Sequence, residues 1–426
     1  MDNKISEETL KEIFLDIKDK IYIREEDKTI IIPPNQVYSL NESGIKLLNH
    51  LYKTDNFKEI IDRSAEPEKT KIELFEFLTS IISLMKEELD EEKTAGIEFQ
   101  EFKKGFYTYP VLSEFAITHR CNLRCNFCYL ERYDTKEMST KKAKKIILKL
   151  KTEAKVPFIS FTGGEPVLRD DLEELMRYSV SIGLKVNLIS NGTLLTEDKV
   201  KSLKKAGLRS AQISLESPER EIHNFLTNSK SFDKTVQGIK NLISQKIYVH
   251  TNTTINRYNF RSMFDYPEFA KSIGLKKFSA NIIIPVGTAK KHRELWLDYT
   301  EIGDIIDEIK MNADKHGIEF IWYSPLPYCI YNPISKGLGS KSCAACHGLV
   351  SIDPEGYINP CSSYPERVGN WLKQDFKKIW FSEKAVSFRE MDYLPEICKN
   401  CEYKEMCTGA CPLYWKTRGY NEITGK

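Results

Sequence analysis

The stretch Thr118-His119-Arg120-Cys121-Asn122-Leu123-Arg124-Cys125-Asn126-Phe127-Cys128-Tyr129 carries three thiols within eight residues, spaced four and then three apart. Three cysteines are one fewer than the four that close a structural zinc or iron–sulfur site. A metal centre with three protein ligands keeps one coordination position open for chemistry. The spacing therefore predicts a catalytic metal centre, with an incomplete zinc knuckle or a chance cluster as the alternatives.

The composition sets the class of protein. Lys+Arg 63 against Asp+Glu 61 give a net charge of +2, so no overall charge favours nucleic acid or acidic substrates. No apolar run is long enough to cross a bilayer, and residues 1–8 lack a charged and then apolar signal segment. We therefore expect a cytoplasmic protein with no membrane or nucleic-acid partner.

The 11 cysteines are unevenly distributed. None precedes Cys121, three lie in the opening stretch, and the other eight come at Cys329 or later. Thiols stay reduced in the cytosol, so metal ligation is favoured over disulfides. The sequence thus predicts two metal-binding regions separated by a cysteine-free segment.

From Ser113 to about Trp322, β-type runs alternate with helical patterns. The expected strands are 115–118, 158–161, 185–190, 210–215, 247–254 and 278–284. The helices expected between and after them include 139–154, 170–182, 196–206, 232–245 and 300–316. Repeated strand-then-helix units predict parallel strands, which place ligands at their carboxyl ends. Cys121 follows the first strand almost at once.

Cys121-x3-Cys125-x-Phe127-Cys128 resembles the cluster motif of the radical S-adenosylmethionine (SAM) enzymes. The resemblance implies an α/β fold with a (βα)6 partial TIM barrel. It also implies that the three thiolates hold a [4Fe–4S] cluster whose fourth iron is chelated by SAM. A reductant such as flavodoxin or ferredoxin would supply the electron.

Polar strand ends resemble the SAM contacts of that family. Thr162-Gly163-Gly164-Glu165-Pro166 is similar to the segment that binds the methionyl amine. Ser190, Asn191, Ser214 and Glu216 would contact the ribose and carboxylate, and Phe127 the adenine. The family often has Asp where Glu216 stands and Arg-Gly where this chain has Thr227-Asn228. Ordinary loop polarity is the alternative for these residues.

The C-terminal cysteines follow a second pattern: Cys343-x2-Cys346, then Gly356 and Cys361, then Cys398-x2-Cys401-x5-Cys407-x3-Cys411. A zinc-ribbon pair would account for the last four thiols. The whole pattern resembles the SPASM extension of radical SAM maturases, which binds auxiliary iron–sulfur clusters. By that resemblance Cys343, Cys346, Cys361 and Cys411 bind one cluster. Cys398, Cys401 and Cys407 bind another, together with a thiol that lies further downstream in that family. No cysteine follows Cys411 here, so this cluster uses a non-thiolate ligand, keeps an open iron or is absent. Cys329 is left as a spare thiol, which is either a buried apolar residue or a ligand from the opposite direction along the chain.

Residues 1–92 predict a small domain of three strands (21–23, 29–32 and 36–40) followed by three helices. The first helix begins at Asn41 or Ser43, and the others span about 56–63 and 68–89. This winged-helix-like order makes DNA binding a candidate function. The carboxylates of Glu59, Glu66, Glu68 and Glu73 would, however, repel phosphate. The segment 37–48 resembles the PqqD-like domain, in which a leader peptide adds to the β-edge.

We therefore expect four parts: a PqqD-like peptide-recognition domain at 1–92, a linker at 93–110, a radical SAM partial barrel at 111–325 and a SPASM domain at 326–426. The function that the resemblance implies is hydrogen abstraction from a ribosomally made peptide through a 5′-deoxyadenosyl radical, forming a thioether or carbon–carbon crosslink. One rival is action on a small molecule such as a tetrapyrrole, or on a folded protein such as a sulfatase. The other is a non-enzymatic iron–sulfur sensor that binds DNA.

Overall fold

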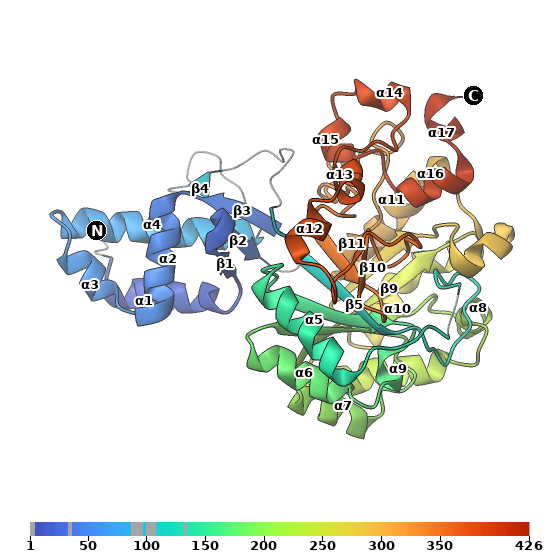
Figure 1. Cartoon of the computed structure of the whole chain (residues 1–426), viewed down its shortest axis with the longest axis horizontal. Helices are drawn as coiled ribbons and strands as arrows, with labels where there is room; N and C mark the ends of the chain where they lie inside the picture. Colours follow the sequence, from blue (N-terminus) through green and yellow to red (C-terminus); the bar gives the residue numbers. More distant parts are fainter. Residues whose placement is uncertain (1–4, 33–35, 87–96, 99–107, 132–133, 426) are drawn as a thin grey trace. The chain divides into compact units, whose positions relative to one another are not determined.

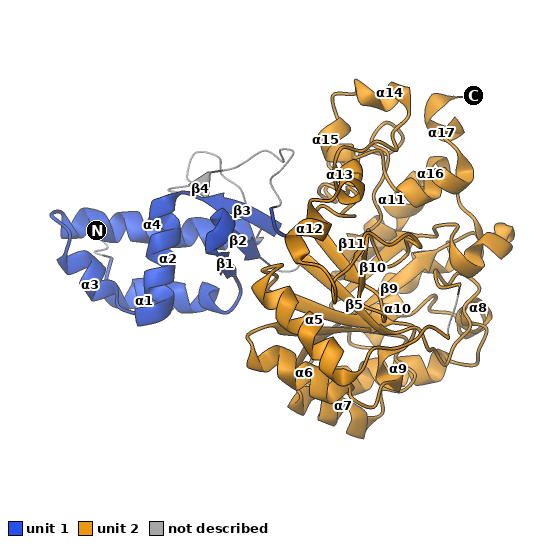
Figure 2. Cartoon of the chain, in the orientation of Figure 1, with its two compact units in different colours: residues 1–111 blue, residues 112–426 orange. Residues whose placement is uncertain are grey.

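The computed structural model describes residues 5–32, 36–86, 97–98, 108–131 and 134–425. The chain forms two compact units, Met1–Val111 and Leu112–Lys426 (Figure 2). Among the described residues, no helix combines the length and hydropathy needed to cross a bilayer.

Unit 1 holds a four-stranded antiparallel sheet in the order β1-β2-β3-β4. Its elements are α1 (Glu7–Lys18), β1 (Tyr22–Arg24), the 3-10 turn η1 (Glu25–Asp27), β2 (Thr29–Ile32), β3 (Gln36–Leu40), α2 (Glu42–Thr54), α3 (Phe57–Asp62), α4 (Pro67–Lys86) and β4 (Ile97–Glu98). Asn41 is the N-cap of α2, and its side chain accepts a hydrogen bond from the Gly44 amide over 2.8 Å.

Two elements of unit 1 differ from the expected order. Helix α1 precedes the strands and buries Leu10, Phe14 and Ile17, which lie on one face at helical spacing. Strand β4 lies inside the range 93–110 that we expected to be a linker, and it pairs with Ser39 and Leu40 of β3. The winged-helix-like order is therefore incomplete as a description of this unit.

Unit 2 is built on a ten-stranded sheet in the order β11-β10-β9-β8-β7-β6-β5-β12-β13-β14. The parallel strands are β5 (Leu112–Thr118), β6 (Phe158–Gly163), β7 (Lys185–Ser190), β8 (Leu208–Ser214), β9 (Tyr248–Ile255), β10 (Lys277–Ile282) and β11 (Glu319–Trp322). Six of them were expected, and the short β11 adds a seventh beside β10. The sequential order is that of an open, partial barrel.

Helices connect the parallel strands. They are α5 (Thr140–Thr152), α6 (Leu172–Ser181), α7 (Glu197–Lys205), α8 (Arg220–Thr227), α9 (Phe232–Ser244), α10 (Tyr266–Ser272) and α11 (Tyr299–His316). Figure 1 shows α5, α6, α7 and α9 covering one side of the strands. In β9 the residues Val249, Thr251, Thr253 and Ile255 are buried and alternate with less buried ones. Successive side chains of a strand point to opposite faces of the sheet, so one face of β9 is more deeply buried than the other.

The cysteine-rich region continues the same sheet. Strand β12 (Leu349–Ile352) pairs in parallel with β5, and β13 (Tyr357–Asn359) and β14 (Gly369–Asn370) follow antiparallel. The remaining helices are α12 (Phe376–Trp380), α13 (Glu383–Arg389), α14 (Glu396–Lys399), α15 (Lys404–Cys407), α16 (Pro412–Arg418) and α17 (Asn421–Thr424). Glu153 at the end of α5 accepts hydrogen bonds from the Trp371 indole and the Phe376 amide. The barrel and the cysteine-rich region therefore share one core.

Candidate cluster and cofactor site

The loop with Cys121, Cys125 and Cys128 leaves the carboxyl end of β5 and is fixed by backbone contacts. The Asn126 amide donates to the Leu226 carbonyl over 2.9 Å. The Thr288 hydroxyl donates to the carbonyls of Cys125 and Cys128 at 2.9 and 3.1 Å. A Cβ on Gly287 would lie 2.3 Å from the Cys128 carbonyl oxygen, so only glycine allows this approach. Gly287 and Thr288 could not be selected from the sequence, because they lie far from the motif; Thr288 is 160 residues downstream of Cys128.

The three thiols of this loop interact electrostatically. Burial raises the pKa of Cys121 to about 11. Burial, and then the neighbouring Cys128, Glu216 and Cys121, raise the pKa of Cys125 well above its ordinary value. Thiols that are costly to ionise alone are stabilised as thiolates by metal ligation. Three thiols on one fixed loop fit a cluster site with an open position.

Gly163 and Gly164 allow the end of β6 to pack against the cysteine loop. Gly163 has φ +137°, and a Cβ there would lie 2.0 Å from the Thr118 carbonyl oxygen. A Cβ on Gly164 would lie 2.3 Å from the Arg120 carbonyl oxygen. The Gly164 and Glu165 amides donate to the carbonyls of Thr118 and Arg120, both over 2.8 Å. The close approach that these glycines permit is thus to the main chain that precedes Cys121.

The Glu165 carboxylate is buried and joins the ends of β6 and β7. It accepts hydrogen bonds from the Ser190 hydroxyl at 2.9 Å, the Asn191 amide at 2.9 Å and the Val167 amide at 3.1 Å. Burial raises the pKa of Glu165 to about 7, and the hydrogen bonds act in the opposite direction. A ligand ammonium beside this buried carboxyl would favour its charged form, because a neighbouring opposite charge lowers the pKa of a carboxyl.

Asn191 reaches the cluster loop. Its side-chain nitrogen lies 3.9 Å from Cys121 Sγ and donates to Asn122 Oδ1 over 2.9 Å. The Asn122 side-chain nitrogen Nδ2 in turn donates to the Thr193 hydroxyl over 2.8 Å. The end of β7 is therefore connected to the Cys121 thiol through Asn191. Asn122 lies inside the motif and contacts both Asn191 and Thr193, which the cysteine spacing alone did not reveal.

Glu216 lies just beyond the end of β8 and is buried. Its Oε2 accepts from the Thr254 amide over 2.8 Å, and its own amide donates to His223 Nδ1 over 3.2 Å. Burial raises the pKa of Glu216 to about 8. Ser214, the last residue of β8, lies opposite Asn252 of β9. Phe127 is partly buried against the barrel core.

The segment Thr227-Asn228 departs from the family pattern without disturbing the backbone. Thr227 is buried, and its hydroxyl donates to the His223 carbonyl over 2.8 Å. Asn228 ends α8 in the left-handed conformation, with φ 48°. Asparagine tolerates this conformation better than most residues, so it can stand where a glycine is usual.

The C-terminal thiols form two groups. Burial, and then Cys343 and Cys411, raise the pKa of Cys361 well above its ordinary value, and Cys411 and Cys346 act in the same way on Cys343. Cys398, Cys401 and Cys407 lie on and around the short helices α14 and α15. The consecutive residues Thr408, Gly409 and Ala410 all have positive φ, which turns the chain sharply between Cys407 and Cys411. Cys411 interacts with Cys343 and Cys361, whereas Cys398 interacts with Cys401 and Cys407, which does not favour a zinc ribbon built from the last four thiols.

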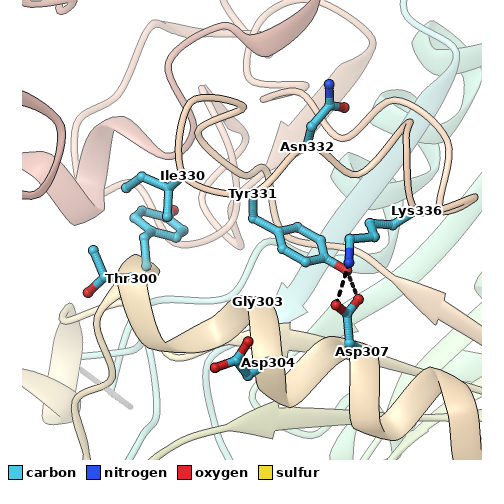
Figure 3. A pocket seen from close by; sticks show the side chains of 9 residues that line it. Thr300, Gly303, Asp304, Asp307, Ile330, Tyr331, Asn332 and Lys336 are labelled. Carbon is cyan, nitrogen blue, oxygen red and sulfur yellow. Dashed lines mark hydrogen bonds and ion pairs between the residues drawn. The ribbon is translucent and has the colours of Figure 1, made fainter.

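A groove in unit 2 lies away from the cysteine loop. It is lined by Tyr299, Thr300, Gly303, Asp304, Asp307, Ile330, Tyr331, Asn332 and Lys336, as Figure 3 shows. Lys336 Nζ and the Tyr331 hydroxyl both contact Asp307, each over 2.6 Å. None of the predicted site residues lines this groove. Within the described ranges, no three His, Cys, Asp or Glu side chains lie close enough together to bind a single metal ion. An iron–sulfur cluster differs from a single ion because its ligands bind several separate irons.

A cysteine loop at the carboxyl end of the first parallel strand, with further thiol groups attached to the same sheet, defines an iron–sulfur enzyme of the α/β class. Residues 115–265 match the profile of the Radical SAM superfamily. Residues 343–402 match that of the iron–sulfur cluster-binding domain named SPASM. The chain therefore contains a radical SAM domain and a SPASM domain. It binds SAM at a [4Fe–4S] cluster and carries auxiliary iron–sulfur clusters.

Known proteins resemble the chain over most of its length. The AdoMet-dependent heme synthase of Methanosarcina barkeri is 29% identical over 328 residues, which cover 70% of this chain and 90% of that protein. The PqqA peptide cyclase of Bradyrhizobium diazoefficiens is 26% identical over 328 residues, covering 74% and 84%. Streptococcus suis SuiB bound to its precursor peptide SuiA superposes with a TM-score of 0.69 at 15% identity, covering 94% of this chain and 96% of that one. The last comparison establishes a shared fold.

Proposed function

We propose that this enzyme modifies a ribosomally made precursor peptide and forms a thioether or carbon–carbon crosslink. The observation that carries the proposal is the likeness to SuiB, which covers 94% of the chain and so includes most of unit 1. That protein was solved with its precursor peptide bound. The similarity to a peptide cyclase gives independent support.

Unit 1 has the form that peptide recognition by strand addition requires. Its antiparallel sheet ends in β1 on one side and β4 on the other. The two-residue β4 pairs with Ser39 and Leu40 of the five-residue β3. A leader segment of the precursor would pair with an edge of this sheet through main-chain hydrogen bonds.

In unit 2 the residues of the candidate site would bind and orient the cluster and SAM and would exclude water. Cys121, Cys125 and Cys128 would hold the catalytic cluster, and Glu165, Ser190, Asn191, Ser214 and Glu216 would position SAM. When bound, these groups supply reductive cleavage of SAM to a 5′-deoxyadenosyl radical and, at the auxiliary sites, an acceptor for the electron released by bond formation. A small electron donor such as flavodoxin or ferredoxin would provide the reducing electron. The buried, hydrogen-bonded strand ends keep their geometry without solvent.

A small-molecule substrate is the second candidate, because the heme synthase similarity spans 90% of that protein. In that case unit 1 would not be needed for turnover. Removal of residues 1–111 would leave substrate conversion intact, whereas the peptide proposal expects conversion of the precursor to be lost while SAM cleavage remains.

The proposal is tested by mass spectrometry of short peptides encoded beside the gene and co-expressed with the enzyme without oxygen. A loss of two hydrogens per crosslink is expected with the wild type and none with Cys125→Ala. Unchanged peptide masses, with SAM still cleaved by the purified enzyme, would contradict the peptide substrate.

A further inference from the structure

A tight turn at residues 327–331 brings Cys329 close to the set of three thiols formed by Cys398, Cys401 and Cys407. The Tyr328 amide donates a hydrogen bond to Cys407 Sγ over 3.4 Å. The same sulfur lies 3.6 Å from the Leu326 carbonyl oxygen. Tyr328, the residue that precedes Cys329, is therefore in direct contact with the thiol of Cys407.

The turn is held in place from both sides. The Ile330 and Tyr331 amides donate to the Pro327 carbonyl at 2.9 and 3.0 Å. The Tyr331 hydroxyl donates to Asp307 of α11, a contact visible in Figure 3. The rings of Tyr328 and Tyr403 lie 6.4 Å apart, so the turn also packs on the segment between α14 and α15. Cys329 thus occupies a defined position.

All four thiols interact with one another. Burial, and then Cys407 and Cys401, raise the pKa of Cys329. Burial, and then Cys329, Cys407 and Cys401, raise the pKa of Cys398 to about 11. Cys407 is buried, Cys398 is half-buried, and Cys329 and Cys401 are exposed, so the group extends from the core to the surface.

We propose that Cys329 is the fourth thiolate ligand of an auxiliary [4Fe–4S] cluster held by Cys398, Cys401 and Cys407. The inference rests on the assignment of those three thiols to one cluster and is independent of the substrate. Four thiolates are the usual complement of such a cluster, and Cys329 is the fourth thiol that interacts with Cys398, Cys401 and Cys407. With a thiolate on every iron, no iron is open to a substrate thiol, and this site serves electron transfer.

The test counts clusters in the full-length chain. In a Cys121→Ala, Cys125→Ala, Cys128→Ala background only auxiliary clusters remain, and iron, sulfide and electron paramagnetic resonance (EPR) spectra are measured on anaerobically prepared protein. Adding Cys329→Ala should remove about four irons per chain, as Cys401→Ala should. If the irons stay, mild oxidation should give the EPR signal of a three-iron cluster, which the background lacks.

Double variants decide which group Cys329 belongs to. Cys329→Ala with Cys401→Ala should lose no more iron than either change alone, because both act on one cluster. Cys329→Ala with Cys343→Ala should lose the irons of both clusters. The conservative Cys329→Ser should keep the iron and shift the EPR spectrum. Iron and spectra identical to the background in all Cys329 variants, or losses that add with Cys401→Ala, would overturn the assignment.

Discussion

Gly164 lies where a side chain would collide with main chain. A Cβ at this position would lie 2.3 Å from the Arg120 carbonyl oxygen and 2.6 Å from that of His119, one and two residues before Cys121. These two carbonyl groups could make room for a side chain only if the cysteine loop itself moved.

We expect Gly164→Ala to lower the iron content of anaerobically prepared protein by about four irons per chain, because the loop can no longer present its thiols together. SAM cleavage should be lost in parallel. Gly348→Ala is the matched control, since a Cβ at Gly348 meets nothing within 4 Å. Wild-type iron in Gly164→Ala would show that the loop adapts to the methyl group.

His223 fixes the strand end that carries Glu216 only while the imidazole is neutral. Its Nδ1 accepts from the Glu216 amide, and its Nε2 contacts the Ser231 hydroxyl at 3.1 Å. Burial lowers the pKa of His223 to about 4, below its ordinary 6.5. Between these values the unfolded chain binds a proton at His223 and the folded chain does not, so stability falls as pH falls through this window.

The free energy of unfolding of the wild type should therefore decrease more than that of His223→Gln when the pH falls from about 7 to about 5. Urea denaturation followed by tryptophan fluorescence measures the difference, and all five tryptophans lie in unit 2. Parallel pH profiles for the two proteins would show that His223 titrates freely in the folded state.

The chemistry-bearing residues were predictable where the chemistry itself requires a residue type. Thiol spacing marked the cluster loop, and polar residues after strands marked Glu165, Asn191 and Glu216. Gly287, Thr288 and His223 carry no such signal, since they act through distant backbone contacts. Their positions depend on how β8, β10 and the cysteine loop meet in space.

At the scale of elements, the segment Arg24–Lys28 reads as a charged surface turn in the sequence but encloses a buried ion pair. Arg24 is 1% exposed and donates to Asp27 at 2.8 and 2.7 Å. It also donates to the Pro110 carbonyl over 2.7 Å, and Asp27 accepts from the Thr29 hydroxyl over 2.8 Å. One arginine therefore joins β1, η1 and the end of unit 1.

Arg24→Met should destabilise unit 1 by about 3 kcal/mol, because the largely enclosed Asp27 carboxylate loses its cationic partner. Hydrogen exchange of β2 amides, followed by mass spectrometry, should accelerate about 100-fold. Tryptophan fluorescence should not change, since it reports unit 2. Lys46→Ala, which breaks the exposed pair with Glu42, is the control and should stay within about 0.5 kcal/mol. Equal exchange in both variants would mean that the Arg24 pair adds nothing.

Elements with strong periodicity were predictable, and short ones were not. The six expected barrel strands all form, because each is an apolar run between helical patterns. The two-residue β4 and the four-residue β11 exist because β3 and β10 offer them a hydrogen-bonding edge. Helix α1 has a clear signal in Ser6, which caps it, and in Leu10, Phe14 and Ile17.

At the scale of the whole molecule, the two units divide recognition from chemistry in our account. Unit 2 contains every cysteine of the chain, while unit 1 contains none. The SPASM region shares the barrel's sheet through the β5–β12 pair, so the thiol groups are built on one scaffold. The substrate does not follow from this architecture, because the similar chains include a heme synthase and a peptide cyclase.

The central claim is that the loop of Cys121, Cys125 and Cys128 is the site of reductive SAM cleavage. The most direct measurement is chromatographic quantification of 5′-deoxyadenosine formed anaerobically from SAM and a strong reductant. We predict that the wild type and Cys329→Ser form 5′-deoxyadenosine and that Cys125→Ala forms none. Equal amounts from Cys125→Ala and the wild type would contradict the account.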